Sequence, residues 1–63
     1  MKVHLLTIGD EILIGQIIDT NSAWMAQQLN LIGAQVQGIT SISDDLEDIV
    51  YSLERLLPQT DVI

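Results

Sequence analysis

The feature that most constrains this fold is the alternation of strand-like and helix-like segments within only 63 residues. Residues 3–8 form an apolar run with β-branched side chains that Gly9 stops, which predicts a strand buried on both faces. Residues 34–41 predict a second strand with a possible bulge at Gly38, and residues 61–63 predict the start of a third. Because helical segments separate these strands, we expect parallel pairing through right-handed crossovers and a mostly parallel α/β sheet.

The two helical segments differ in the clarity of their pattern. From Leu46 to Leu57 the apolar residues are spaced at i, i+3, i+4, i+7, i+10 and i+11, which predicts a helix with one apolar face that ends at Pro58. Asp44 followed by Glu47 resembles a capping box at its start.

The earlier helix is predicted from Asn21, where Met25, Leu29 and Ile32 recur at helical spacing. Thr20 or Asn21 can cap its first turn, and Gly33 suits the position just after its end.

The segment that joins the first strand to this helix, GDEILIGQIIDTN at residues 9–21, combines acidic residues, glycines and apolar residues. We predict a loop over residues 9–20. Its isoleucines and leucine, at residues 12–14 and 17–18, are too apolar for a solvated loop, so we expect them to pack against other parts of the protein.

Charge and composition restrict the partners. The formal charge is −7, with nine acidic residues against Lys2 and Arg55, which argues against nucleic acid and anionic membranes. No apolar run approaches the roughly 20 residues of a membrane span, and the N-terminus has no secretory-signal pattern. The absence of cysteine and the single histidine, His4, exclude a disulfide framework and the usual all-protein zinc site. A cytoplasmic location is the default expectation.

Acidic and amide side chains follow both predicted strands. In parallel sheets, the carboxyl ends of the strands meet at one edge, where ligands bind. We therefore expect one acidic rim, formed by Asp10, Glu11, Asp19, Asn21, Asp44 and Asp45.

A rim of this kind suits a ligand that carries phosphate and is held through Mg²⁺ or a similar divalent cation. Magnesium prefers one or two carboxylates together with substrate oxygens and water. Gly9 and Gly15 allow close approach of the backbone, and the N–H groups where the helix starts at Asn21 can face phosphate oxygens.

A purely structural interpretation of the same residues stays open. Asp and Asn between a strand and a helix commonly serve as caps and turns, which is the more common role for a residue placed like Asp44. A histidine within a strand, such as His4, is more often structural, and Trp24 is more often a packed or interface residue than a ligand-stacking one. Asp45, Asp48 and Glu54 fit a solvated helix face.

The stretch TIGDEILIGQIIDTNSAWMAQQLNLIGAQV, with SISDD downstream, resembles the start of the competence/damage-inducible protein A (CinA) family, in the molybdopterin-binding (MoaB/MogA-like) superfamily. The resemblance covers nearly the whole chain, and its most specific part is G-D-E-I-L-x-G-x-I-x-D-T-N. It implies a three-layer α/β fold with a mostly parallel sheet. Family members follow the third strand with a Thr-Gly-Gly-type loop, so residues 1–63 are expected to be the N-terminal part of a single longer domain.

The resemblance also implies a function. CinA-type N-terminal domains are associated with metal-dependent hydrolysis of the ADP-ribose pyrophosphate, and superfamily relatives bind molybdopterin. By position, Gly9, Asp10, Gly15, Asp19 and Asn21 would contact the ligand, while the catalytic and metal-binding residues would be Glu11 and Asp44. Many relatives have Thr where Asp10 stands.

Three functional hypotheses follow. The first is a nucleotide pyrophosphatase in the parent protein, and the second is a molybdopterin-binding module without hydrolysis. The third is a piece that is inactive alone and only self-associates, because 48% of its residues are apolar and we expect its strand edge to be open. A homo-oligomer is therefore expected.

Overall fold

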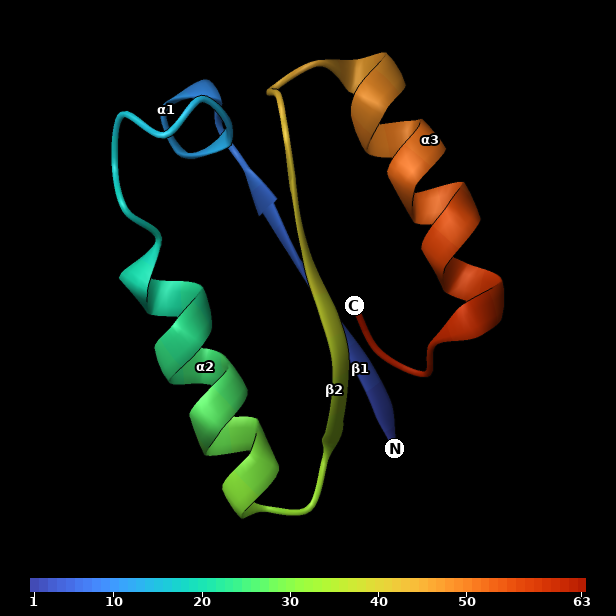
Figure 1. Cartoon of the computed structure of the whole chain (residues 1–63). Coiled ribbons are helices and arrows are strands. Elements are labelled where there is room, and N and C mark those ends of the chain that lie inside the picture. The colour runs from blue at the N-terminus through green and yellow to red at the C-terminus, as the bar shows by residue number, and fades with distance from the viewer.

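The computed structural model describes all residues, 1–63, and the elements follow the predicted order (Figure 1). Two strands, three α-helices and one 3₁₀ turn are formed: β1 (Lys2–Ile8), α1 (Asp10–Leu13), α2 (Thr20–Leu31), β2 (Gln35–Ile42), α3 (Leu46–Leu56) and η1 (Leu57–Gln59). None of these helices has the length and apolar character that crossing a membrane requires.

The strands pair in parallel, with β1 in the middle. Its partner β2 lies along one side, in a register that runs from Lys2 opposite Gln35 to Ile8 opposite Ile42. On the other side, Val62 forms a parallel bridge to Val3, and the His4 N–H donates to the Val62 carbonyl at 2.9 Å. The predicted third strand therefore begins beside β1, on the side away from β2.

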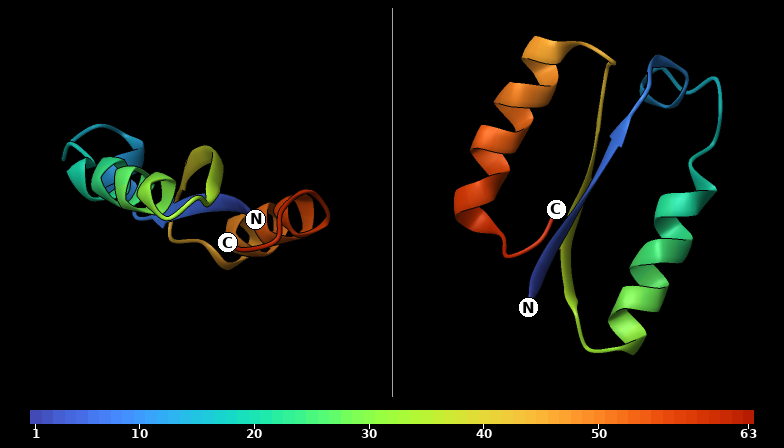
Figure 2. Two further views of the ribbon diagram at one scale, coloured as in Figure 1. Left: turned by 90° about the horizontal axis from the view of Figure 1, so that it is seen from below. Right: turned by 180° about the vertical axis from the view of Figure 1, so that it is seen from behind.

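This order reverses the direction in which the chain crosses the sheet. The chain moves from β1 to β2 on one side and then returns past β1 to Val62 on the other. Right-handed crossovers in opposite directions place their helices on opposite faces. Accordingly, α2 and α3 lie on opposite sides of the strands in both views of Figure 2. The predicted three-layer α/β arrangement with parallel strands is confirmed.

The start of α2 corrects one predicted cap. Asp19, rather than Thr20 or Asn21, is the cap, and its carboxylate accepts a hydrogen bond from the Ser22 N–H at 3.0 Å. The far end of α2 matches the prediction, because Gly33 follows it with a φ of 86°. The Gly33 N–H donates to the Asn30 carbonyl and the Ala34 N–H donates to the Leu29 carbonyl, and these two bonds form a Schellman motif.

The start of α3 corrects the second cap. Asp45 accepts from the Glu47 N–H at 3.1 Å, so the predicted pair of Asp44 and Glu47 does not form the cap. The prediction is off by one position, because the helix begins at Leu46 and the residue before it, Asp45, has the extended backbone of a cap. The Ser43 hydroxyl also donates to Asp48 at 2.6 Å. Asp45, Asp48 and Glu54 are all exposed, as predicted for a solvated helix face.

The core is small and lies mainly on the α2 face. The buried apolar side chains are Val3, Leu5 and Ala34, and Ser22 of α2 is the buried polar one. Side chains alternate along a strand, so Val3 and Leu5 face α2 while His4 faces α3. The prediction that the first strand is buried on both faces is wrong, since its α3-facing residues are only half-buried or exposed.

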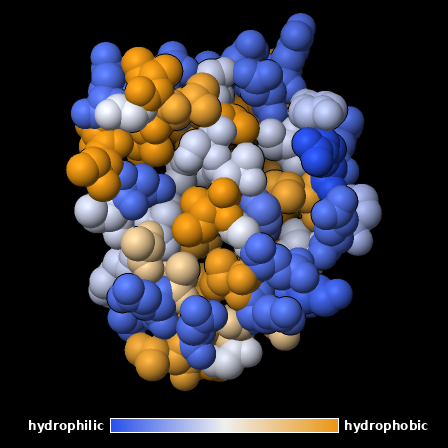
Figure 3. Space-filling model, in the orientation of Figure 1, coloured by the Kyte–Doolittle hydropathy of each residue, from blue (hydrophilic) through white to orange (hydrophobic).

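The connection between β1 and α2 also differs from the prediction. Residues 10–13 form one helical turn, α1, instead of a loop. Its apolar neighbours do not pack within the chain, since Ile14, Ile17 and Ile18 are 65%, 57% and 84% exposed, and Trp24 is 62% exposed. Figure 3 shows apolar surface gathered at the α1 end of the molecule.

Candidate functional site

The exits of β1 and β2 lie at one edge of the sheet. The Gly9 N–H, just after β1, donates to the Ile42 carbonyl at the end of β2 at 3.0 Å. In Figures 1 and 2, α1 and the connection from β2 to α3 lie side by side at the same end of the molecule. The juxtaposition that the sequence predicted for these two turns is therefore confirmed.

The turn after β1 presents its acids around a buried glycine. Gly9 has a φ of 155°, and Asp10 and Glu11 lie in the first turn of α1. The Glu11 carboxylate bends back over Gly9, so that a Cβ at Gly9 would lie 2.6 Å from Glu11 Oε1. The helical turn ends at Gly15, whose φ is 80° and whose N–H donates to the Ile12 carbonyl. Both glycines thus shape the turn itself.

Asp44 lies in the connection between β2 and α3, two residues after the strand ends. It is exposed, and the capping hydrogen bond of α3 is made by Asp45 instead. The Asp44 carboxylate is therefore not used by the helix that follows it. The structure brings Gly9, Asp10, Glu11 and Asp44 to the same edge of the sheet.

Asp19 and Asn21 lie elsewhere, at the start of α2. Figure 1 shows that α2 begins beside the strands, beyond the loop that descends from α1. The side chain and then the backbone N–H of Ser22 donate to Asp19, which lowers the pKa of its carboxyl below the ordinary value. Asp19 therefore has a structural role at the α2 cap, and the convergence predicted for all six rim residues is not complete.

The predicted metal site depends on how many possible ligand side chains the fold brings together. The chain assembles no group of three or more histidine or acidic side chains able to hold an ion. A cage made by this chain alone is therefore not formed. Mg²⁺ also binds in another mode, with one or two protein carboxylates and a shell completed by substrate oxygens and water.

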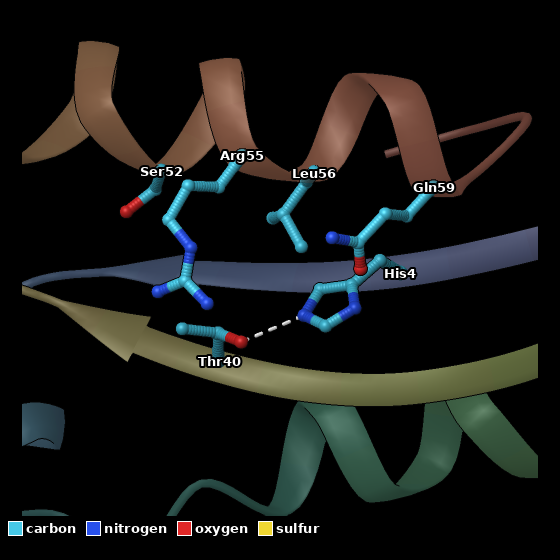
Figure 4. Close-up of a pocket in the computed structure, with 6 residues that line it drawn as sticks. All are labelled: His4, Thr40, Ser52, Arg55, Leu56 and Gln59. Atoms are coloured by element: carbon cyan, nitrogen blue, oxygen red, sulfur yellow. Dashed lines mark hydrogen bonds between the residues drawn. The ribbon is translucent and has the colours of Figure 1, made fainter.

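A second polar cluster lies away from this edge, and sequence reasoning missed it. A pocket of about 200 Å³ opens between α3 and the strands (Figure 4), lined by His4, Thr40, Ser52, Arg55, Leu56 and Gln59. A lone histidine in a strand gave no sign of it. The only available signal was the spacing of Ser52, Arg55 and Leu56 on one side of the predicted helix.

The fold and the edge define a class: an α/β domain with parallel strands whose carboxyl ends carry acidic residues, at the edge where sheets of this kind bind ligands. A family model described as a probable molybdopterin binding domain matches residues 4–63, and the chain belongs to this family.

Relatives of known sequence make the assignment more particular. The chain is 49% identical over its full length to a CinA-like protein of Flavobacterium psychrophilum and 38% identical to one of Geotalea uraniireducens, and it spans 15% of each of them. Among solved structures it is similar to the protein CinA, of unknown function, from Thermoplasma acidophilum, with a TM-score of 0.89 and 32% identity over 97% of this chain and 37% of that one. The resemblance to the CinA family is confirmed.

Proposed function

We propose that the protein carrying this chain hydrolyses the pyrophosphate bond of an ADP-ribose-like nucleotide at the edge where β1 and β2 end. The observation that carries the proposal is the hydrogen bond between Gly9 and Ile42, which holds the two turns together. Glu11 and Asp44 are distant in sequence but follow these adjacent strand ends. The strand order supports the same location, because a crossing reversal next to β1 is where open α/β sheets bind ligands.

The residues of the edge have separate tasks in this proposal. Glu11 and Asp44 would hold a divalent cation, which would neutralise charge that develops on the phosphate oxygens. The exposed backbone around Gly15 would lie against the phosphates, since no side chain obstructs approach there, and Gly9 would leave room for the Glu11 carboxylate that lies over it. A carboxylate of the pair would orient the water that attacks phosphorus, and AMP and ribose 5-phosphate would leave.

Release of AMP from ADP-ribose with Mg²⁺ tests this function in the protein carrying the chain. Glu11→Gln keeps the size of the side chain and removes its charge, so we expect a loss of kcat by about 100-fold or more. Glu47→Gln is the matched control, because it makes the same change at an exposed glutamate, in the first turn of α3, to which the proposal gives no role. Unchanged turnover in the Glu11 variant would remove Glu11 from the reaction.

A second candidate is binding of molybdopterin without hydrolysis, which the description of the matching family supports. The same edge would then take the phosphate of a pterin. Equilibrium binding distinguishes the two: a pterin phosphate that binds more tightly than ADP-ribose, with no AMP released, would favour the binding module.

Self-association is the third part of the proposal. The exposed apolar residues near α1 and the free outer edge of β2 favour contact with further protein surface, and a homo-oligomer is one way to cover them. Sedimentation that finds only a compact monomer at micromolar concentration would contradict self-association.

A further inference from the structure

The pocket between α3 and the strands has an unusual lining for this acidic chain. Five of its six lining side chains are polar, and Leu56 is the single apolar one. No acidic side chain lines it, although nine of the 63 residues are acidic. Its volume of about 200 Å³ is several times the roughly 30 Å³ that one water occupies in the liquid, so it can hold a small polyatomic group.

Arg55 supplies the positive charge of this pocket. It is one of only two basic residues in the chain, and Figure 4 shows its guanidinium directed from α3 toward the strands. Its guanidinium carbon also lies 5.6 Å from the centre of the Tyr51 ring, one helical turn earlier. A guanidinium presents five N–H donors in a fork that matches phosphate and carboxylate oxygens.

Three local features fix the position of the His4 ring across the pocket from Arg55. The register of the strands shifts between Val3 and His4, which brings Gly38 opposite His4. A Cβ at Gly38 would lie 3.0 Å from His4 Cε1, so glycine makes room for the ring. The ring nitrogen Nε2 is hydrogen-bonded to the Thr40 hydroxyl at 2.7 Å. A bulge next to a site is a common means of redirecting a side chain.

The rest of the lining adds further donors. Ser52 contributes a hydroxyl and Gln59 an amide, both from the α3 side of the pocket. Such a set, with one permanent cation and several neutral donors, suits an anion with several acceptor oxygens better than a cation or an apolar ligand.

We propose that this pocket is a second site, which binds a small oxyanion with a single phosphate group between Arg55 and His4. His4 lies in the middle of β1, whereas the edge with Glu11 and Asp44 begins after Ile8. The proposal therefore stands independently of nucleotide hydrolysis at that edge.

Inorganic phosphate, titrated at constant ionic strength into protein with isotopically labelled histidine, tests the site. The His4 ring resonance, identified by its loss in His4→Gln, is expected to shift and to saturate. Arg55→Gln should weaken binding by about tenfold or more, because it removes a charge-assisted contact. The affinity of Arg55→Lys for phosphate should lie between those of the unchanged protein and Arg55→Gln, since lysine keeps the charge but loses the forked N–H donors of the guanidinium.

Two controls separate this pocket from general attraction of anions. Lys2→Gln removes the other basic side chain, and Tyr51→Phe changes a residue outside the lining while it keeps the ring beside Arg55. Both variants should bind phosphate as the unchanged protein does, and unaltered amide spectra verify their folding. Absence of a saturable His4 shift, equal affinity in Arg55→Gln, or equal weakening by Lys2→Gln would overturn the proposal.

Discussion

The two faces of the strand pair differ in how they are filled. On the α2 face, Val3, Leu5 and Ala34 are buried and form a small apolar core. On the α3 face, no residue of the helix is buried, and a polar pocket lies where the core would continue. The helix α3, which has the clearer apolar periodicity in the sequence, therefore covers the less completely packed face. Periodicity indicates which side of a helix faces the sheet, but not how completely that side is filled.

The largest expected difference between the faces is in the cost of removing a leucine. Leu5→Ala should lower the free energy of unfolding by about 2–4 kcal/mol, because Leu5 is only 8% exposed in the α2-face core. Leu56→Ala should cost about 1 kcal/mol, because Leu56 is half-buried beside the pocket. Urea titrations followed by circular dichroism measure both. Equal losses would contradict the difference in packing.

Two glycines give the next comparison. Gly33→Ala should cost about 1 kcal/mol, since the residue after α2 has a φ of 86° that a Cβ disfavours. Gly38→Ala should act on the pocket instead, because its Cβ would press on the His4 ring. The same urea titration measures the first effect, and the His4 ring resonance reports the second. A His4 resonance that shifts in Gly33→Ala but not in Gly38→Ala would break this assignment.

The smallest effect is expected at the start of α2 and depends on pH. The folded-state pKa of Asp19 lies below its unfolded value, because Ser22 donates to the carboxylate. The stabilisation is therefore fully present above the unfolded pKa and is lost as pH falls through the folded pKa. Acidification to about pH 2 should narrow the stability gap between the unchanged protein and Asp19→Ala. A gap that is constant with pH would exclude ionised Asp19 as the cap.

The fold was largely predictable because its signals are local. The strand-like run at residues 3–8, the helical spacing from Leu46 and the glycine after Ile32 each depend on neighbours in sequence. The errors at the caps of α2 and α3 are shifts of one or two residues, since Asp, Asn, Ser and Thr are nearly interchangeable as caps and occur in runs here.

The polar pocket was not predictable for a different reason. The position of the His4 ring depends on the strand register that brings Gly38 and Thr40 of β2 next to β1. The register between strands that are distant in sequence cannot be read from either strand alone. The shared edge was predictable, because parallel pairing brings the ends of the strands together whatever their sequence. The placement of Asp19 and Asn21 was not, because the length of the α1 turn and the loop after it sets where α2 begins.

The central claim is that Glu11 and Asp44, 33 positions apart in sequence, serve one site. A double-mutant cycle on AMP release from ADP-ribose tests it most directly, with Glu11→Gln, Asp44→Asn and the pair. If the two carboxylates act together, the double variant should lose little more activity than the more damaging single variant. Losses that multiply would show two independent roles and contradict a shared site.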